Sequence, residues 1–124
     1  MEFFNKDCNG MVLHSGNGEY KVVGNLNNLS QNQKLMFIAP NPPTYLLGYT
    51  GSGLPYPNST VAFENTQNKG IVIPDKDGRF EFKINYPNSY YKKLGSVYIE
   101  PHIYLKLCGN KKIHEIKLGN GIPN

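Results

Sequence analysis

Hydrophobic and polar residues alternate with a period of two in most of the apolar stretches of this chain. In residues 79–84 every second side chain is apolar and the residues between them are charged, and residues 102–107 alternate in a similar way. Such a pattern predicts strands with one buried face and one exposed face. The apolar positions expected to form the core are Phe80, Phe82, Ile103, Leu105 and Leu107.

Tight-turn sequences divide the chain into short strands. Asp77-Gly78 predicts a hairpin between residues 70–73 and 79–84, and Gly109-Asn110 predicts another between 102–107 and 111–118. The further elements expected are a hairpin of residues 11–14 with 19–26, strands at 34–39 and 60–64, and a helical turn at 28–34. About seven or eight short strands predict an all-β fold, a single antiparallel β-sandwich domain over residues 1–124.

Residues 40–59 interrupt the alternation, because proline and glycine are too frequent there for a regular strand ladder. Loops of this length in compact domains usually serve a function. The segment also holds apolar side chains, which either pack back on the domain or contact another protein. The residues expected at such a partner contact are Tyr45, Leu46, Leu47, Tyr49 and Tyr56.

The composition is compatible with a globular domain of 124 residues, with 39% hydrophobic residues and a net charge of +4. Six lysines lie within residues 92–117, but no nucleic-acid-binding motif accompanies them, so we expect a solvated strand face. Residues 1–4 lack the basic n-region and the apolar h-region of a signal peptide, so none is expected. No apolar run approaches the roughly 18–20 residues that span a bilayer. We therefore expect a soluble protein made in the cytosol.

The chain contains two cysteines, Cys8 and Cys108. They are far apart in the sequence and lack the close spacing that is typical of a zinc site. Since thiols are kept reduced in the cytosol, both cysteines are expected to be free.

Residues 74–107 resemble the core of the intradiol ring-cleavage dioxygenases. "DKDGRFEFKINYPNSYY" is similar to the Asp-Gly turn, strand and tyrosine segment of that family, and "EPHIYL" is similar to its histidine segment. The resemblance implies a transthyretin-like or dioxygenase-core topology. In the family, two tyrosines and two histidines hold iron(III), and the resemblance places Tyr90 at a tyrosine ligand and His102 at a histidine ligand.

Several positions depart from the pattern of that family. Tyr104 stands at the second histidine position, Ile71 stands in the region of the other tyrosine ligand, and Glu100 replaces an arginine. Tyr90, His102 and Tyr104 are therefore interpreted as the positions of a vestigial metal site that binds no metal and no cofactor. A single histidine on a strand, without partners at ligand spacing, is also more often an ordinary hydrogen-bonded residue than a metal ligand.

A second resemblance covers residues 35–107. "YTGSGLPYPN", "AFENTQNKG" and "PNSYYKKLGS" are similar to segments of virion proteins of nucleocytoplasmic large DNA viruses. This resemblance implies a small capsid-associated protein on a dioxygenase-like frame that has lost its metal. The Asn- and Lys-rich composition fits the AT-rich genome of such a virus.

Together these patterns favour a non-enzymatic structural component of a large DNA virus particle, a minor capsid or capsid-associated protein made in the host cytoplasm. The expected partners are other capsid proteins within an oligomeric assembly, with no membrane span and no nucleic acid. Two alternatives stay open. One is a non-haem iron dioxygenase of the intradiol type with altered ligands, for which iron is the cofactor, and the other is a carbohydrate- or peptide-binding β-sandwich module.

Overall fold

The fold consists mainly of short antiparallel strands. The computed structural model describes residues 2–6, 8, 11–16, 18–26, 33–43 and 55–118. The strands are β1 (Tyr20–Asn25), β2 (Leu35–Ile38), β3 (Lys69–Val72), β4 (Arg79–Ile84), β5 (Tyr90–Lys92), β6 (Val97–Ile99), β7 (His102–Leu107) and β8 (Ile113–Lys117). The helices are α1 (Ser59–Phe63) and the 3-10 helices η1 (Glu2–Asn5) and η3 (Lys93–Gly95). All these strands pair in antiparallel fashion, which confirms the predicted all-β class.

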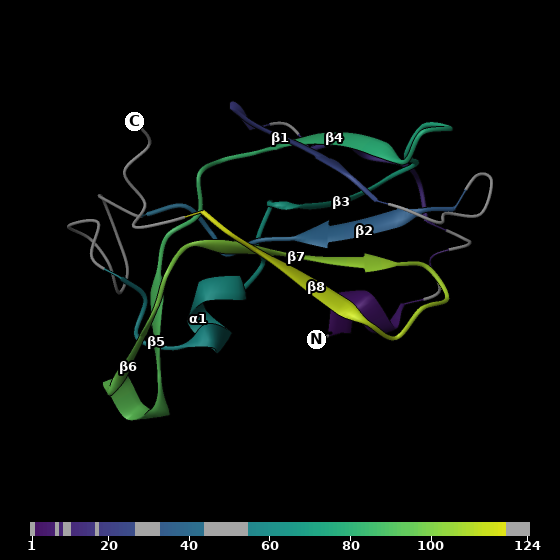
Figure 1. Cartoon of the computed structure of the whole chain (residues 1–124). Helices are drawn as coiled ribbons and strands as arrows, with labels where there is room; N and C mark the ends of the chain where they lie inside the picture. Colours follow the sequence, from purple (N-terminus) through teal and green to yellow (C-terminus); the bar gives the residue numbers. More distant parts are fainter. Residues whose placement is uncertain are drawn as a thin grey trace.

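Two sheets form the body of the molecule (Figure 1). The larger sheet has the strand order β3-β2-β7-β8, and the smaller sheet consists of β1 and β4. In Figure 1 the smaller sheet lies above the larger one, and the hairpin of β5 and β6 extends away from both. The arrangement is sandwich-like, while the transthyretin-like or dioxygenase-core topology stays a prediction.

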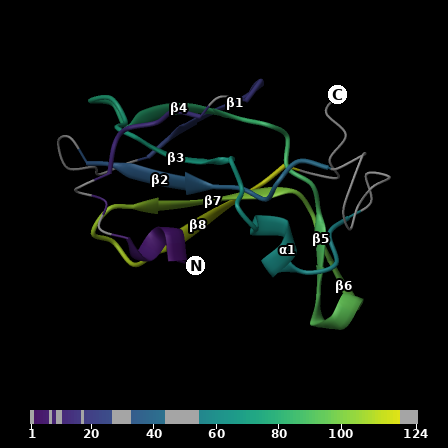
Figure 2. The same ribbon diagram turned by 180° about the vertical axis from the view of Figure 1, so that it is seen from behind.

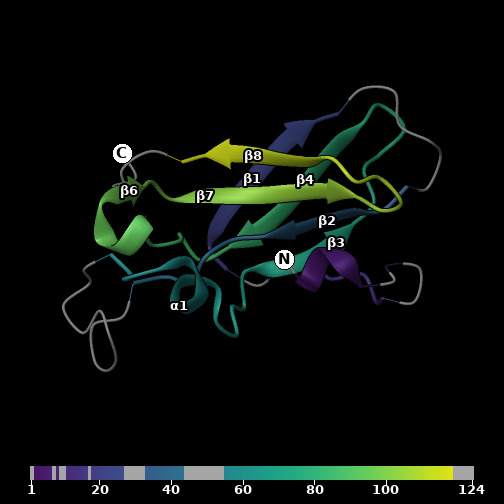
Figure 3. The same cartoon turned by 90° about the horizontal axis from the view of Figure 1, so that it is seen from below.

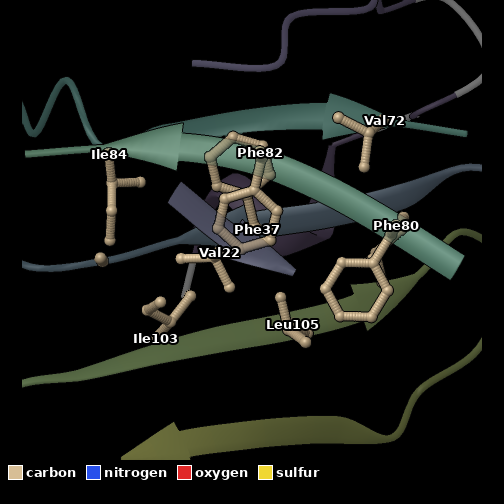
Figure 4. Packing of buried hydrophobic residues seen from close by; sticks show 10 residues of the cluster. Val22, Phe37, Val72, Phe80, Phe82, Ile84, Ile103 and Leu105 are labelled. Atoms are coloured by element: carbon tan, nitrogen blue, oxygen red, sulfur yellow. The ribbon is translucent and has the colours of Figure 1, made fainter. Parts of the chain in front are cut away.

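The main core fills the space between these two sheets (Figure 4). At its centre the rings of Phe37, from β2, and Phe82, from β4, stack with their centroids 3.9 Å apart. Burial of each large apolar side chain contributes roughly 1.5–3 kcal/mol. Four of the five predicted core residues are buried, and Leu107 is partly buried at the margin.

Helical segments cover the opposite face of the larger sheet. Figure 3 shows η1 and α1 in front of this sheet with β1 and β4 behind it, and the view from behind shows the same order of layers (Figure 2). Met36 and Ile38 of β2 point to this second face, where they pack with Phe3 and Phe4. Because β2 is buried on both faces, its sequence is a continuous apolar run.

Cys8 and Cys108 form a disulfide, with their Cα atoms 6.0 Å apart, so the prediction of free thiols is wrong. This separation suits the geometry of a disulfide. Cys8 follows η1 and Cys108 follows β7, so packing of the N-terminal segment on the sheet brings together residues 100 positions apart. Lys106 strengthens this attachment, because its Nζ donates a hydrogen bond to the carbonyl oxygen of Phe4 at 2.6 Å.

The predicted hairpin across Gly109-Asn110 is present as the antiparallel pair of β7 and β8. The hairpin predicted across Asp77-Gly78 is wrong, because β3 pairs with β2 whereas β4 pairs with β1. Pro74 follows β3 closely and has no N–H group with which to continue a ladder. The Asp77-Gly78 turn therefore lies on a connection between the two sheets.

The predicted hairpin of residues 11–14 with 19–26 is also wrong. Residues 11–14 contribute a single bridge, between His14 and Ile71, at the edge of β3. β1 pairs along its whole length with β4. Alternation identifies a strand and its buried face, but it does not identify the neighbour of that strand.

The strand predicted at residues 60–64 is wrong, since most of this segment forms α1. Asn58 begins the helix, because its backbone is extended and its side-chain oxygen accepts a hydrogen bond from the Val61 N–H at 2.9 Å. This cap and the burial of Ala62 stabilise one turn of helix against the strand preference of Thr60 and Val61. The helical turn predicted at 28–34 lies outside the described residues, except for residues 33 and 34, which are not helical.

Hydrogen bonds from buried polar side chains hold the backbone of Ala39 and Pro40, where the chain enters the 40–59 segment. Asn68 is 2% exposed, and its amide donates hydrogen bonds to the carbonyl oxygens of Pro40 and Asn85, both at 2.8 Å. The hydroxyl of Thr66 donates to the carbonyl oxygen of Ala39 at 2.8 Å. These bonds satisfy backbone groups that have no strand partner here.

Candidate functional site

The three positions interpreted as a vestigial metal site lie side by side. His102 and Tyr104 are two residues apart on β7, so both side chains point to the helix-covered face of the larger sheet. β5 brings Tyr90 to the same place. The ring centroids of Tyr90 and His102 are 5.5 Å apart, and those of His102 and Tyr104 are 4.6 Å apart. We call Tyr90, His102 and Tyr104 the Tyr/His cluster.

Hydrogen bonds determine the tautomer of His102. Its Nδ1 lies 2.8 Å from the carbonyl oxygen of Glu100, which can only accept, so Nδ1 carries the proton and donates it. In a neutral ring Nε2 is then unprotonated, and it accepts a hydrogen bond from the Tyr90 hydroxyl at 3.3 Å. Both ring nitrogens of His102 therefore have partners within the chain.

Burial keeps both hydrogen-bonded side chains uncharged. Desolvation, followed by the hydrogen bond and charge of Tyr104, raises the pKa of Tyr90 well above its ordinary value. Desolvation also lowers the pKa of His102, and the hydrogen bond to Glu100 opposes this shift. Near neutral pH the pair consists of a protonated phenol and a neutral imidazole.

Phe63 of α1 covers the Tyr/His cluster. Its ring centroid lies 5.9 Å from that of Tyr90, 6.2 Å from that of His102 and 6.0 Å from that of Tyr104. Tyr90 and His102 are each only 1% exposed. A hollow of about 570 Å³ on this face of the molecule is lined in part by Phe3 and Phe63, but by no residue of the cluster. Tyr90 and His102 are therefore closed to solvent, whereas Tyr104 is partly buried.

The cluster does not fit the iron(III) that the dioxygenase resemblance implies. A tyrosine ligand must be deprotonated, and the raised pKa of Tyr90 opposes this. The lone pair of His102 Nε2 is already engaged by the Tyr90 hydroxyl. Ile71 packs among the apolar side chains of η1 and β2 and supplies no ligand atom. Among the residues that the structure describes, no group of three or more His, Cys, Asp or Glu side chains could hold a metal ion.

Of the residues expected at a partner contact, only Tyr56 belongs to the described part of the chain. Its ring packs with Ala62 and Tyr90, and its hydroxyl donates a hydrogen bond to the carbonyl oxygen of Pro42 at 2.6 Å. At 6% exposure Tyr56 offers little surface to a partner, and its role in a partner contact stays a prediction. The other four residues, Tyr45, Leu46, Leu47 and Tyr49, lie outside the described residues.

Phe63 and Glu115 complete the surroundings of the cluster, and neither is predicted as a site residue from the sequence. Phe63 was missed because its segment has a strand-like composition, although Asn58 before it is a recognisable helix cap. Glu115 lies opposite Tyr104 on β8. Desolvation dominates both pKa shifts; the charge of Glu115 adds to the raised pKa of Tyr90 and partly opposes the lowered pKa of His102. Only the register of β7 and β8 reveals this proximity.

No family model, curated protein or solved structure compared with this chain matches it. Both family resemblances, and the roles that they imply, stay predictions. Within the described ranges, no helix has the length and the apolar character needed to cross a membrane.

Proposed function

We propose that this chain is a non-enzymatic structural component of a large DNA virus particle, where it binds other capsid proteins. The observation that most supports this proposal is the burial of Tyr90 and His102, which are each 1% exposed and hydrogen-bond to one another. An enzyme of the intradiol type needs this place to admit a metal ion and a catecholate. Side chains that satisfy one another beneath Phe63 contribute to packing instead.

The assignment to a virion rests on the resemblance of residues 35–107 to virion proteins of nucleocytoplasmic large DNA viruses. A capsid-associated protein requires a stable surface and no reactive centre. The apolar clusters on both faces of the larger sheet are a source of such stability. The proposed contacts with other capsid proteins are made by Tyr45, Leu46, Leu47 and Tyr49.

Iron binding tests the non-enzymatic part of the proposal. The purified protein is incubated with ferric iron, and bound metal, visible absorption and cleavage of catechol are measured. We expect no stoichiometric iron, no tyrosinate-to-iron absorption band and no cleavage. One equivalent of iron with a band that disappears in Tyr90→Phe contradicts the proposal. Tyr91→Phe, on the same strand but outside the cluster, is the matched control.

Mass spectrometry of purified particles tests the virion part. The chain is expected at a constant ratio to the major capsid protein across a density gradient and after salt washes. Its absence from particles of the virus whose genome encodes it contradicts the assignment.

A further inference from the structure

The strand β8 forms an edge of the larger sheet and has only one strand neighbour, β7, among the described residues. Figure 3 shows β8 at the margin of the sheet. At the opposite margin, β3 is bridged by His14, whose backbone exchanges hydrogen bonds with Ile71 at 2.9 and 3.0 Å. In the described part of the chain, the outer side of β8 has no comparable bridge.

The register of β7 and β8 shows which backbone groups of β8 point outward. The Leu118 N–H donates to the carbonyl oxygen of Pro101 at 2.9 Å. In antiparallel strands, hydrogen-bonded and non-hydrogen-bonded pairs alternate, so every second residue back from Leu118 turns its N–H and C=O groups toward β7. The backbone groups of Ile113, Glu115 and Lys117 therefore point away from the sheet, where another strand can pair with them.

The side chains of β8 carry complementary charges along this edge. Glu115 and Lys117 are both exposed and lie two residues apart on the same face of the strand. Neither forms an ion pair with another residue that the structure describes. Ile116 points to the other face, where it packs against the main core.

We propose that two copies of this chain form a dimer by antiparallel pairing of their β8 strands, with the twofold axis at Ile116. This register places Glu115 opposite Lys117 of the partner subunit, and the symmetry repeats the pair. Since both residues point their backbone groups outward, each pair exchanges hydrogen bonds, and its opposite charges attract across the strands. The larger sheet then continues from one subunit into the other.

Other registers lack this complementarity. A twofold axis at Glu115 places Glu115 opposite its own copy, and like charges directly opposite each other destabilise a strand pair. An axis at His114 places Ile113 opposite Glu115 and loses both attractive pairs. A second copy is the occupant that we propose, because an interface with twofold symmetry requires a surface that is complementary to itself, as β8 is at Ile116.

Charge reversal with a charge-swapped double variant tests the dimer. Sedimentation of the full chain is measured over about 1–100 μM, the range in which weak dimers dissociate. The variants are Glu115→Lys, Lys117→Glu and the double variant with both changes. Glu19→Lys makes the same charge change as Glu115→Lys at an exposed residue outside β8, and it is the matched control. Circular dichroism and thermal unfolding establish that each variant is folded.

The wild type and the Glu19→Lys variant are expected to dimerise. Each single reversal on β8 should weaken the dimer by about tenfold or more, because both attractive pairs become repulsive. The double variant should restore the dimer, since the swap recreates the opposite-charge pairs.

Any of three outcomes overturns the proposal: a wild type that is monomeric throughout, folded single variants that dimerise as tightly as the wild type, or a folded double variant that stays monomeric. If one single variant does not fold, the other tests the same pairs. These outcomes do not depend on iron binding or on presence in particles, so the proposed function can fail independently.

Discussion

At the scale of single residues, Phe82 illustrates how the core stabilises the fold. It is 1% exposed and stacks on Phe37 between the two sheets. Phe82→Ala removes the ring and leaves a cavity, so the free energy of unfolding is expected to fall by about 3–5 kcal/mol in urea unfolding. Glu81→Ala, on the exposed face of the same strand, is the control and should change it by less than about 1 kcal/mol. Equal losses in the two variants contradict the assignment of the buried face.

His102 links the stability of the fold to pH. Burial lowers its pKa in the folded chain, so the folded state disfavours the charged ring. As the pH falls below about 6.5, the unfolded chain binds a proton that the folded chain does not, and the free energy of unfolding decreases by up to about 1.4 kcal/mol per pH unit. This decrease ends once the pH reaches the lowered pKa of the folded state.

The variant His102→Gln, which has no titrating ring, isolates this contribution. Urea unfolding of the wild type and the variant is compared at about pH 7.5 and about pH 5.5, on either side of the ordinary histidine pKa. The stability advantage of the wild type is expected to shrink at the lower pH. An advantage that is constant or grows as the pH falls is evidence that His102 is not held neutral by the fold.

At the scale of elements, α1 depends on its surroundings. A helix of five residues is not stable alone, and this one relies on its cap at Asn58 and on packing against β5. Asn58→Ala is expected to lower the free energy of unfolding by about 0.5–2 kcal/mol, measured by thermal or urea unfolding. Asn58→Asp keeps an accepting oxygen at the cap and should preserve most of the stability. If both variants lose the same amount, the cap hydrogen bond is not the cause.

At the scale of the whole molecule, the Cys8–Cys108 disulfide attaches the N-terminal layer to the larger sheet across 100 residues of sequence. Replacing both cysteines by serine is expected to lower the free energy of unfolding by about 2–5 kcal/mol. A reductant should bring the wild type to the level of the double variant, whose stability it leaves unchanged. Unfolding curves with and without reductant measure this. A wild type that does not respond to reductant contradicts the disulfide.

The sequence by itself determined the class of the fold, the buried face of β4, the face of β7 that packs in the main core, and the β7–β8 hairpin. These features are local. A period of two follows from strand geometry, and the Gly109-Asn110 turn joins strands that are neighbours in the chain. The opposite face of β7, predicted to be exposed, is covered at His102. The sequence also placed Tyr90, His102 and Tyr104 in one candidate site through a resemblance, and the structure brings these three residues together.

Only the tertiary structure decided the sheet partners of β1, β3 and β4, the helix at residues 59–63, the disulfide and the burial of Tyr90 and His102. Each of these depends on contacts between residues that are distant in the chain. The alternating pattern of a strand is compatible with several different neighbouring strands, so it does not select one. The strand preference of Thr60 and Val61 is outweighed by the helix cap and by packing. The uncharged state of Tyr90 and His102 likewise follows from their burial under Phe63, and no local sequence pattern predicts this burial.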